Sequence, residues 1–442
     1  MQKHFLFCLC AMAISAPAAA EPWVRGFVVD RYEPAFFYGG RSGTEERGSD
    51  CPKGTIGDND YRTMLSTRWR TEDEIAPLLL KPADDTNPQA THFALETAIS
   101  YRGWRRDIET YINPFGAPDP GMQQVTGKIA EGFDLDGNSK TGGFVSPAGV
   151  RGVDNAYYRA YGCNMSYRGT PYHAYLSMRG IDKMQEGLFT IVIRLSGNKN
   201  PTNDDDVTLE IGYSPDKAAK NAIGGVNSEY SFRQVKGTQY TTVKARIKDG
   251  VLETDPLDEM RVPDFAWFQA NAGEALYRKG RIRLVIEADG NVAGLLGGYR
   301  DWRDVYAKDT WNQGQPEPNS ATTREVFYHQ NQIGMYYALK RNADGFPNPK
   351  TGRNTAISMA YRFTAVPAFV VNSSKPVMVE VPESEKNRVK MAEKLRSQFM
   401  TAIATRAFQN NPFPGKLRQR KPAQPIAGAA KPSDDARNTP SL

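Results

Sequence analysis

The residues best suited to chemistry are oxygen-bearing side chains at alternate positions of a glycine-rich stretch. Asp134, Asp136 and Asn138 alternate within residues 132–143, and Asp154 and Asn155 follow after a short hydrophobic stretch. A hard cation such as Ca²⁺ binds several carboxylate and carbonyl oxygens on a tight loop. The pattern therefore predicts a calcium site built from these five residues. The alternative is a polar turn cluster, in which the Asp and Asn side chains bond to their own backbone.

The first part of this stretch is similar to an EF-hand loop. Asp134, Asp136 and Asn138 match the first three acidic or amide positions of such a loop. Ser139 then replaces the required glycine, and Val145 replaces the closing glutamate. A regular EF-hand is therefore excluded, and we expect Asp154 or Asn155 to supply missing oxygens. Such an ion would order a loop that has little core of its own, so its predicted role is structural.

Four segments together resemble a group of secreted bacterial proteins of unknown function that carry an EF-hand-like Asp-x-Asp-x-Asn calcium loop. They are Glu-Gly-Phe-Asp-Leu-Asp-Gly, Gly-Val-Asp-Asn, Gly-Leu-Leu-Gly-Gly-Tyr and Tyr-Ala-Leu-Lys-Arg-Asn-Ala-Asp-Gly-Phe-Pro-Asn-Pro, all within residues 130–370. The resemblance implies export and calcium binding. It implies no reaction and no catalytic residue.

The amino terminus predicts export. Residues 1–20 contain Lys3, an apolar run and three small residues before Glu21, which is the pattern of a signal peptide cleaved after Ala20. We expect a periplasmic or secreted protein. No later stretch has the roughly 20 apolar residues of a transmembrane helix.

Two cysteines, Cys51 and Cys163, remain after that cleavage. An exported chain can keep a disulfide, so we predict that they pair and anchor the acidic stretch just before Cys163. The alternative is two separate buried thiols. Two cysteines are too few for a cysteine-based zinc site.

The charge distribution bears on partners. The chain of 442 residues has a formal net charge of +6, and the excess lies mostly in residues 411–442, which we predict to be a disordered basic tail. This tail could contact anionic lipid or polysaccharide. Nucleic acid is an unsuitable partner for an exported chain whose charges are otherwise mixed.

Alternating apolar residues predict a mainly β fold. Val207, Leu209 and Ile211 alternate with polar residues, and Asp-Gly pairs at 249–250 and 289–290 mark turns. Many short strands with such turns favour a β-sandwich or jelly-roll-like fold with a few helices, with α+β as the alternative.

The expected organisation has five parts. They are the signal peptide at 1–20, an irregular amino-terminal region with the acidic stretch at 21–184, a β-rich region with an inserted helix at 185–381, a carboxy-terminal helix at 382–410, and the tail. Helices are also predicted near 91–111 and 323–340.

Other candidate chemistry is less specific. Six tyrosines crowd the segment after the acidic stretch and favour a hydrophobic layer over a sugar-binding platform: Tyr157, Tyr158, Tyr161, Tyr167, Tyr172 and Tyr175. The remaining histidines, at 92, 173 and 329, have no zinc-ligand spacing.

No motif identifies a catalytic residue, so the sequence leaves open whether the protein is an enzyme. The leading hypothesis is an exported cell-envelope protein with a structural calcium ion and a binding or structural role, whose partner is a polysaccharide or another envelope protein. The alternatives are an envelope polysaccharide hydrolase or lyase, and an accessory subunit of an exported oxidoreductase.

Overall fold

The computed structural model describes about half of the chain. The described residues are 22–36, 50–51, 114–116, 119, 121–140, 143–164, 180–182, 184–187, 190–222, 224–235, 239–263, 274–311, 332–373, 394 and 397–404. The predicted signal peptide, the predicted helix near 91–111, the three histidines, three of the six tyrosines and the basic tail lie outside these residues.

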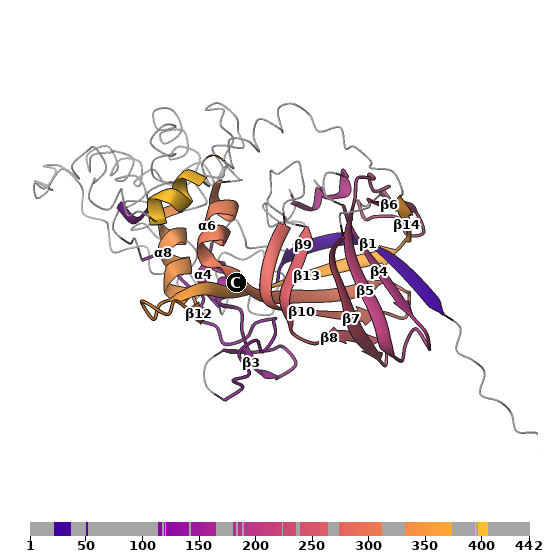
Figure 1. Cartoon of the computed structure of the whole chain (residues 1–442), viewed down its shortest axis with the longest axis horizontal. Helices are drawn as coiled ribbons and strands as arrows, with labels where there is room; N and C mark the ends of the chain where they lie inside the picture. The colour runs from indigo at the N-terminus through magenta and orange to yellow at the C-terminus, as the bar shows by residue number, and fades with distance from the viewer. Residues whose placement is uncertain are drawn as a thin grey trace, which may run out of the picture.

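Eight strands form a closed antiparallel β-barrel (Figure 1). Around the ring they are β1 (Trp23–Pro34), β4 (Thr190–Gly197), β5 (Asp204–Ser214), β7 (Gln239–Lys248), β8 (Val251–Thr254), β10 (Glu274–Ile286), β11 (Val292–Asp301) and β13 (Asn354–Pro367). The ring closes because β1 pairs with β4 along one edge and with β13 along the other.

The predicted sandwich or jelly-roll fold is therefore wrong, and so is the α+β alternative. In a sandwich and in a barrel alike, each strand buries one face, so alternating apolar residues do not distinguish the two. What distinguishes them is the partner of β1. That strand lies in the amino-terminal region that we expected to be irregular, and it makes long-range pairs with β13.

The barrel interior is packed with apolar side chains from directly paired positions. Phe27, Ile193 and Ile211 stand opposite one another across β1, β4 and β5, and all are buried in the main core. Leu296 of β11 and Tyr361 of β13 form a similar buried pair. Paired residues share a face of the sheet, so their neighbours in the chain point to the outside of the barrel.

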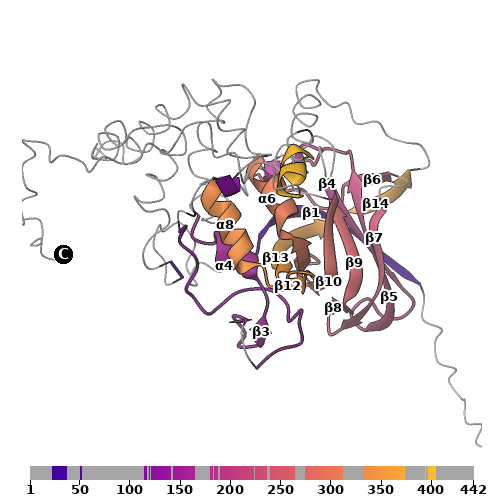
Figure 2. The same cartoon turned by 60° about the vertical axis from the view of Figure 1, so that its left-hand side comes forward.

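Helices gather beside the barrel on one side, as Figures 1 and 2 both show. They are α4 (Ala156–Tyr161), α6 (Trp302–Trp311) and α8 (Gln332–Asn342), with the short helix η1 (Pro114–Gly116) against α8. Residues 397–404, within the predicted carboxy-terminal helix, are also helical, and Phe399 packs against Tyr306 of α6. Tyr157, Tyr158 and Tyr161 are at most 1 % exposed, so these three tyrosines belong to a hydrophobic layer as predicted.

The remaining strands are attached to the barrel or lie outside it. β9 (Leu257–Pro263) pairs with the first half of β10, and β12 (Gly345–Pro347) pairs with β13. β6 (Ser231–Val235) and β14 (Phe369–Ser373) form a two-stranded parallel sheet over the outer face of β1, and β2 (Phe144–Val145) pairs with β3 (Arg151–Val153) in the acidic region. Among the described residues, no helix has the length and apolar character needed to cross a membrane.

Candidate metal centre

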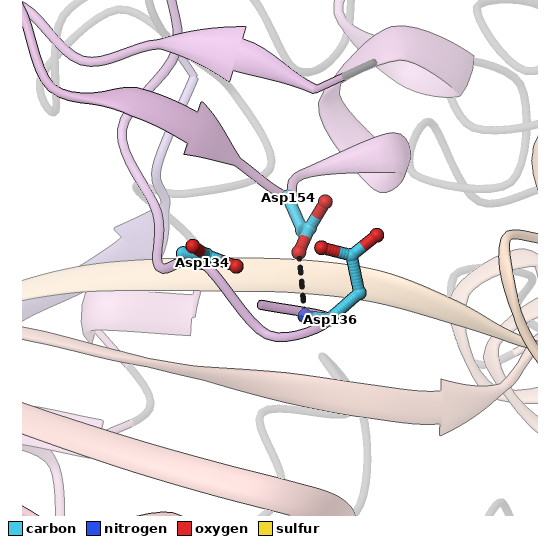
Figure 3. A group of neighbouring side chains, drawn as sticks. All are labelled: Asp134, Asp136 and Asp154. Carbon is cyan, nitrogen blue, oxygen red and sulfur yellow. Dashed lines mark hydrogen bonds between the residues drawn. The ribbon is translucent and has the colours of Figure 1, made fainter. Parts of the chain in front are cut away.

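Three of the predicted ligands converge. Asp134, Asp136 and Asp154 each place a carboxylate oxygen within 4.8 Å of the others. Figure 3 shows Asp134 and Asp136 on one loop and Asp154 on the segment that faces it. The fold thus brings together two parts of the sequence that were predicted to cooperate.

Backbone contacts fix Asp154 against the loop. Its Oδ2 accepts a hydrogen bond from the backbone N–H of Leu135 at 2.7 Å. It also accepts one from the backbone N–H of Asp136 at 3.2 Å, the dashed line in Figure 3. Its own N–H donates to the carbonyl of Phe133 at 2.8 Å. Gly152, just before it, has φ +83°, and a Cβ there would lie 2.8 Å from the Cα of Ser139. Glycine therefore permits the close approach of the two segments.

The loop itself is an Asp/Asn turn structure. Asp134 Oδ1 accepts from Gly137 N–H and Asp136 Oδ1 accepts from Asn138 N–H, each at 2.7 Å. Asn138 Oδ1 accepts from the N–H of Lys140 at 3.2 Å. The polar-turn alternative therefore describes part of the geometry, because these bonds join the side chains to the backbone of their own loop. These bonds use Oδ1 of Asp134 and of Asp136 and leave the second carboxylate oxygen of each residue available to an ion.

Asn155, another predicted ligand, caps a helix. Its Oδ1 accepts from Tyr158 N–H and so caps the amino terminus of α4, and its Nδ2 donates to the carbonyls of Ala35 and Glu131. The side chain is buried. Through these bonds Asn155 caps α4 and ties it to the segments that contain Ala35 and Glu131.

The disulfide between Cys51 and Cys163 is present and lies just beyond α4, with its Cα atoms 5.8 Å apart. Both cysteines are 1 % exposed, so the bond is part of the core. It fixes the carboxy-terminal end of the segment that begins with Asp154.

A fourth carboxylate, that of Asp344, lies close enough for its charge to act on Asp154, and the sequence analysis did not select it. Its two oxygens accept hydrogen bonds from the N–H and the hydroxyl of Ser358, at 2.8 and 2.5 Å. The same hydroxyl accepts from the N–H of Ala156, which attaches α4 to the outside of β13. The Asn-Ala-Asp-Gly segment indicates the end of a helix, but nothing in it indicates that Asp344 lies near the other carboxylates.

Burial and the neighbouring negative charges disfavour the ionised form of two of these carboxylates. The pKa of Asp154 is raised from 3.8 to about 6, mainly by burial and also by the charges of Asp136 and Asp344, while the two backbone hydrogen bonds lower it. Burial likewise raises the pKa of Asp344 to about 6, with a contribution from the charge of Asp136. In the described part of the chain, no lysine or arginine side chain pairs with the carboxylates of Asp134, Asp136 or Asp154.

Two cationic side chains contact the backbone of the loop that carries Asp134 and Asp136. Lys279 Nζ and Arg281 Nη1 each lie 3.4 Å from a loop carbonyl oxygen, those of Leu135 and Asp134 respectively. Both cations extend from an irregularity in β10, where Lys279 has φ +49°. They contact the loop backbone and leave its carboxylates unpaired.

Comparison with known proteins adds no assignment: no family model, no curated protein and no solved structure matches this chain.

Proposed function

We propose that this is an exported cell-envelope protein in which a Ca²⁺ ion bound by Asp134, Asp136 and Asp154 holds the acidic loop against the outside of the barrel. Its role is binding or structural, with a polysaccharide or another envelope protein as partner. The observation that carries the proposal is the convergence of three carboxylates within 4.8 Å without a cationic side chain between them among the described residues.

The charge of the region supports a divalent ion. Four aspartates contribute up to four negative charges, and Lys279 and Arg281 contribute two positive ones nearby. A divalent cation would neutralise the remainder. Carboxylates with one oxygen in a backbone hydrogen bond and one uncommitted suit Ca²⁺, which takes six to eight oxygens in flexible geometry.

The test is thermal unfolding of the mature protein with EDTA and with added Ca²⁺. We expect Ca²⁺ to raise the Tm and EDTA to reverse the rise, because a ligand that binds only the folded state stabilises it. The double variant D134A/D136A should lose the response. An identical Tm in EDTA and in excess Ca²⁺ would refute the proposal. Amino-terminal sequencing of the exported protein tests cleavage before Glu21.

A second candidate is the polysaccharide hydrolase. It is favoured by Asp154 and Asp344, whose raised pKa values near 6 suit proton transfer close to neutral pH. Release of reducing sugar from envelope polysaccharide, lost in both D154N and D344N, would support this candidate. No release by the wild-type protein at any pH between 4 and 8 would refute it.

A further inference from the structure

Three large apolar side chains are exposed on or beside the small sheet formed by β6 and β14. Phe369 and Val371 of β14 are 60 % and 53 % exposed, and Tyr230, directly before β6, is 50 % exposed. The inner face of the same sheet packs on the barrel, where Phe232 joins Val28 of β1 in one apolar cluster. Half of the six large apolar side chains that are exposed among the described residues therefore gather at this sheet, and such a concentration indicates an interaction surface.

The hydrogen-bond pattern leaves one edge of β14 open. The N–H of Phe369 donates to the carbonyl of Tyr230 at 2.9 Å. In a parallel pair of strands, the residues whose N–H and C=O groups face the partner strand alternate along the chain. Phe369 and Val371 therefore bond to β6, and the N–H and C=O groups of Val370 and Asn372 point away from it.

The two outer edges of this sheet differ in how they are covered. On β6, the N–H of Arg233 donates to the carboxylate of Asp216 at 2.7 Å, and the guanidinium of Arg233 donates to the same carboxylate. On β14, the open edge begins against β1, because a Cβ at Gly26 would lie 3.0 Å from the nitrogen of Val370. Asn372 is exposed, and within the described part of the chain no hydrogen bond reaches the open side of its backbone. Unpaired backbone groups on an exposed edge are a template for another extended strand.

The charge of the edge fits a second copy of this chain. Monomeric proteins protect such edges with charged side chains or proline, and β14 (Phe-Val-Val-Asn-Ser) contains neither. Arg233, on the exposed face of the neighbouring strand, is neutralised by its ion pair with Asp216. Two identical edges can therefore meet without placing like charges opposite each other.

We propose that two copies of the protein associate through β14. A two-fold axis near Asn372 would place the two β14 strands side by side and antiparallel, so that each supplies backbone partners to the other. The result is a four-stranded sheet in the order β6, β14, β14, β6, in which Phe369 and Val371 of both copies share the exposed face.

This inference goes beyond the proposed function and is independent of the calcium ion. In Figures 1 and 2 alike, β6 and β14 lie far from α8 and from β3 of the acidic region. The association should therefore be the same in EDTA and in Ca²⁺.

The experiment is analytical ultracentrifugation of the purified protein at increasing concentration. We expect a monomer–dimer equilibrium, measurable by about 0.3 mM because a contact between two strand edges is a small interface. Asn372→Pro removes the outward N–H of an exposed edge residue, a position where a strand tolerates proline. Val371→Lys places like charges near the two-fold axis. Each variant should weaken dimerisation at least about 10-fold.

The matched control is Val150→Lys, since Val150 is also an exposed valine, at 61 %, but lies between β2 and β3. It should dimerise as wild type does. A charge exchange tests the pairing itself: V371K and V371E should each be monomeric, and their equimolar mixture should form dimers.

Two results would overturn the inference. A wild-type protein that stays monomeric throughout this range would exclude self-association, and any strand bound at this edge would then come from another protein. A dimer that both N372P and V371K leave unchanged would place the interface elsewhere. Neither result bears on the calcium site, whose test is the response of the Tm to Ca²⁺ and EDTA.

Discussion

Asp154→Asn tests the electrostatics of the cluster and the ion with one change. The amide is close to the carboxylate in shape, and its oxygen can still accept from Leu135 and Asp136 N–H. The variant removes the negative charge whose burial the fold disfavours, and it also removes a charged ligand. Its effect on stability should therefore change sign between metal-free and metal-loaded protein.

The magnitude without metal follows from the pKa of Asp154. A rise from 3.8 to about 6 would correspond to about 3 kcal/mol at full weight, at 1.36 kcal/mol for each pH unit. Because Asp154 is partly exposed, solvent screening reduces this to about 1 kcal/mol. The folded state binds more protons than the unfolded state between about pH 4 and pH 6, so stability falls as the pH rises through that window and stays low above it.

In EDTA at pH 7, Asp154→Asn should therefore be about 1 kcal/mol more stable than wild type, and near pH 4 the two should be equal. In Ca²⁺ at 100 times the Kd, wild type should gain about 2.7 kcal/mol and the variant much less. Urea denaturation at both pH values, with EDTA and with Ca²⁺, measures all four differences. The reasoning is refuted if the variant is less stable than wild type in EDTA at pH 7, or if Ca²⁺ stabilises both proteins equally.

Three further predictions concern the same region. Gly152→Ala should destabilise the protein by about 1–3 kcal/mol, because φ +83° and contact with Ser139 exclude a Cβ, and a variant with unchanged urea midpoint would contradict this. Cys51→Ser with Cys163→Ser should cost up to about 5 kcal/mol for a loop of this length, measured by urea denaturation against oxidised wild type; equal midpoints in the oxidised wild type and the variant would argue against it. The rise in Tm caused by Ca²⁺ should be larger at pH 7 than at pH 5, because the repulsion that the ion relieves is smaller when the carboxylates are protonated; the same rise at both pH values would exclude that cause.

The sequence predicted which segments belong to the candidate site because its signal is local. Alternating aspartates on glycine-permitted turns indicate clustered oxygens, and Asp154 follows within the same stretch of chain. The same reasoning selected Asn155, whose side chain caps α4 in the structure. Asn155 precedes a helix of six residues, and capping competes with metal binding for its side chain.

Asp344 could not be found in this way, because its position depends on long-range register. Asp344 directly precedes β12, which pairs with β13, and its carboxylate accepts hydrogen bonds from Ser358 of β13. Local patterns show that these segments are extended, but they do not show which strand lies beside which. The closed barrel was missed for the same reason: its deciding contact joins β1 and β13, more than 300 residues apart in the chain.

The position of the carboxylate cluster also indicates which part of the protein a bound ion would order. Tyr299 and Ser358 point outward from β11 and β13, whereas the paired Leu296 and Tyr361 fill the interior. An ion in the cluster would therefore act on the outer wall of the barrel, where it joins the acidic loop, α4 and β12. Since Asn155 and the disulfide already fix α4, the loop that carries Asp134 and Asp136 is the element whose order depends most on the ion. A partner recognised in an ion-dependent manner should contact that loop, and one recognised through the barrel or the helical layer should bind equally well in EDTA.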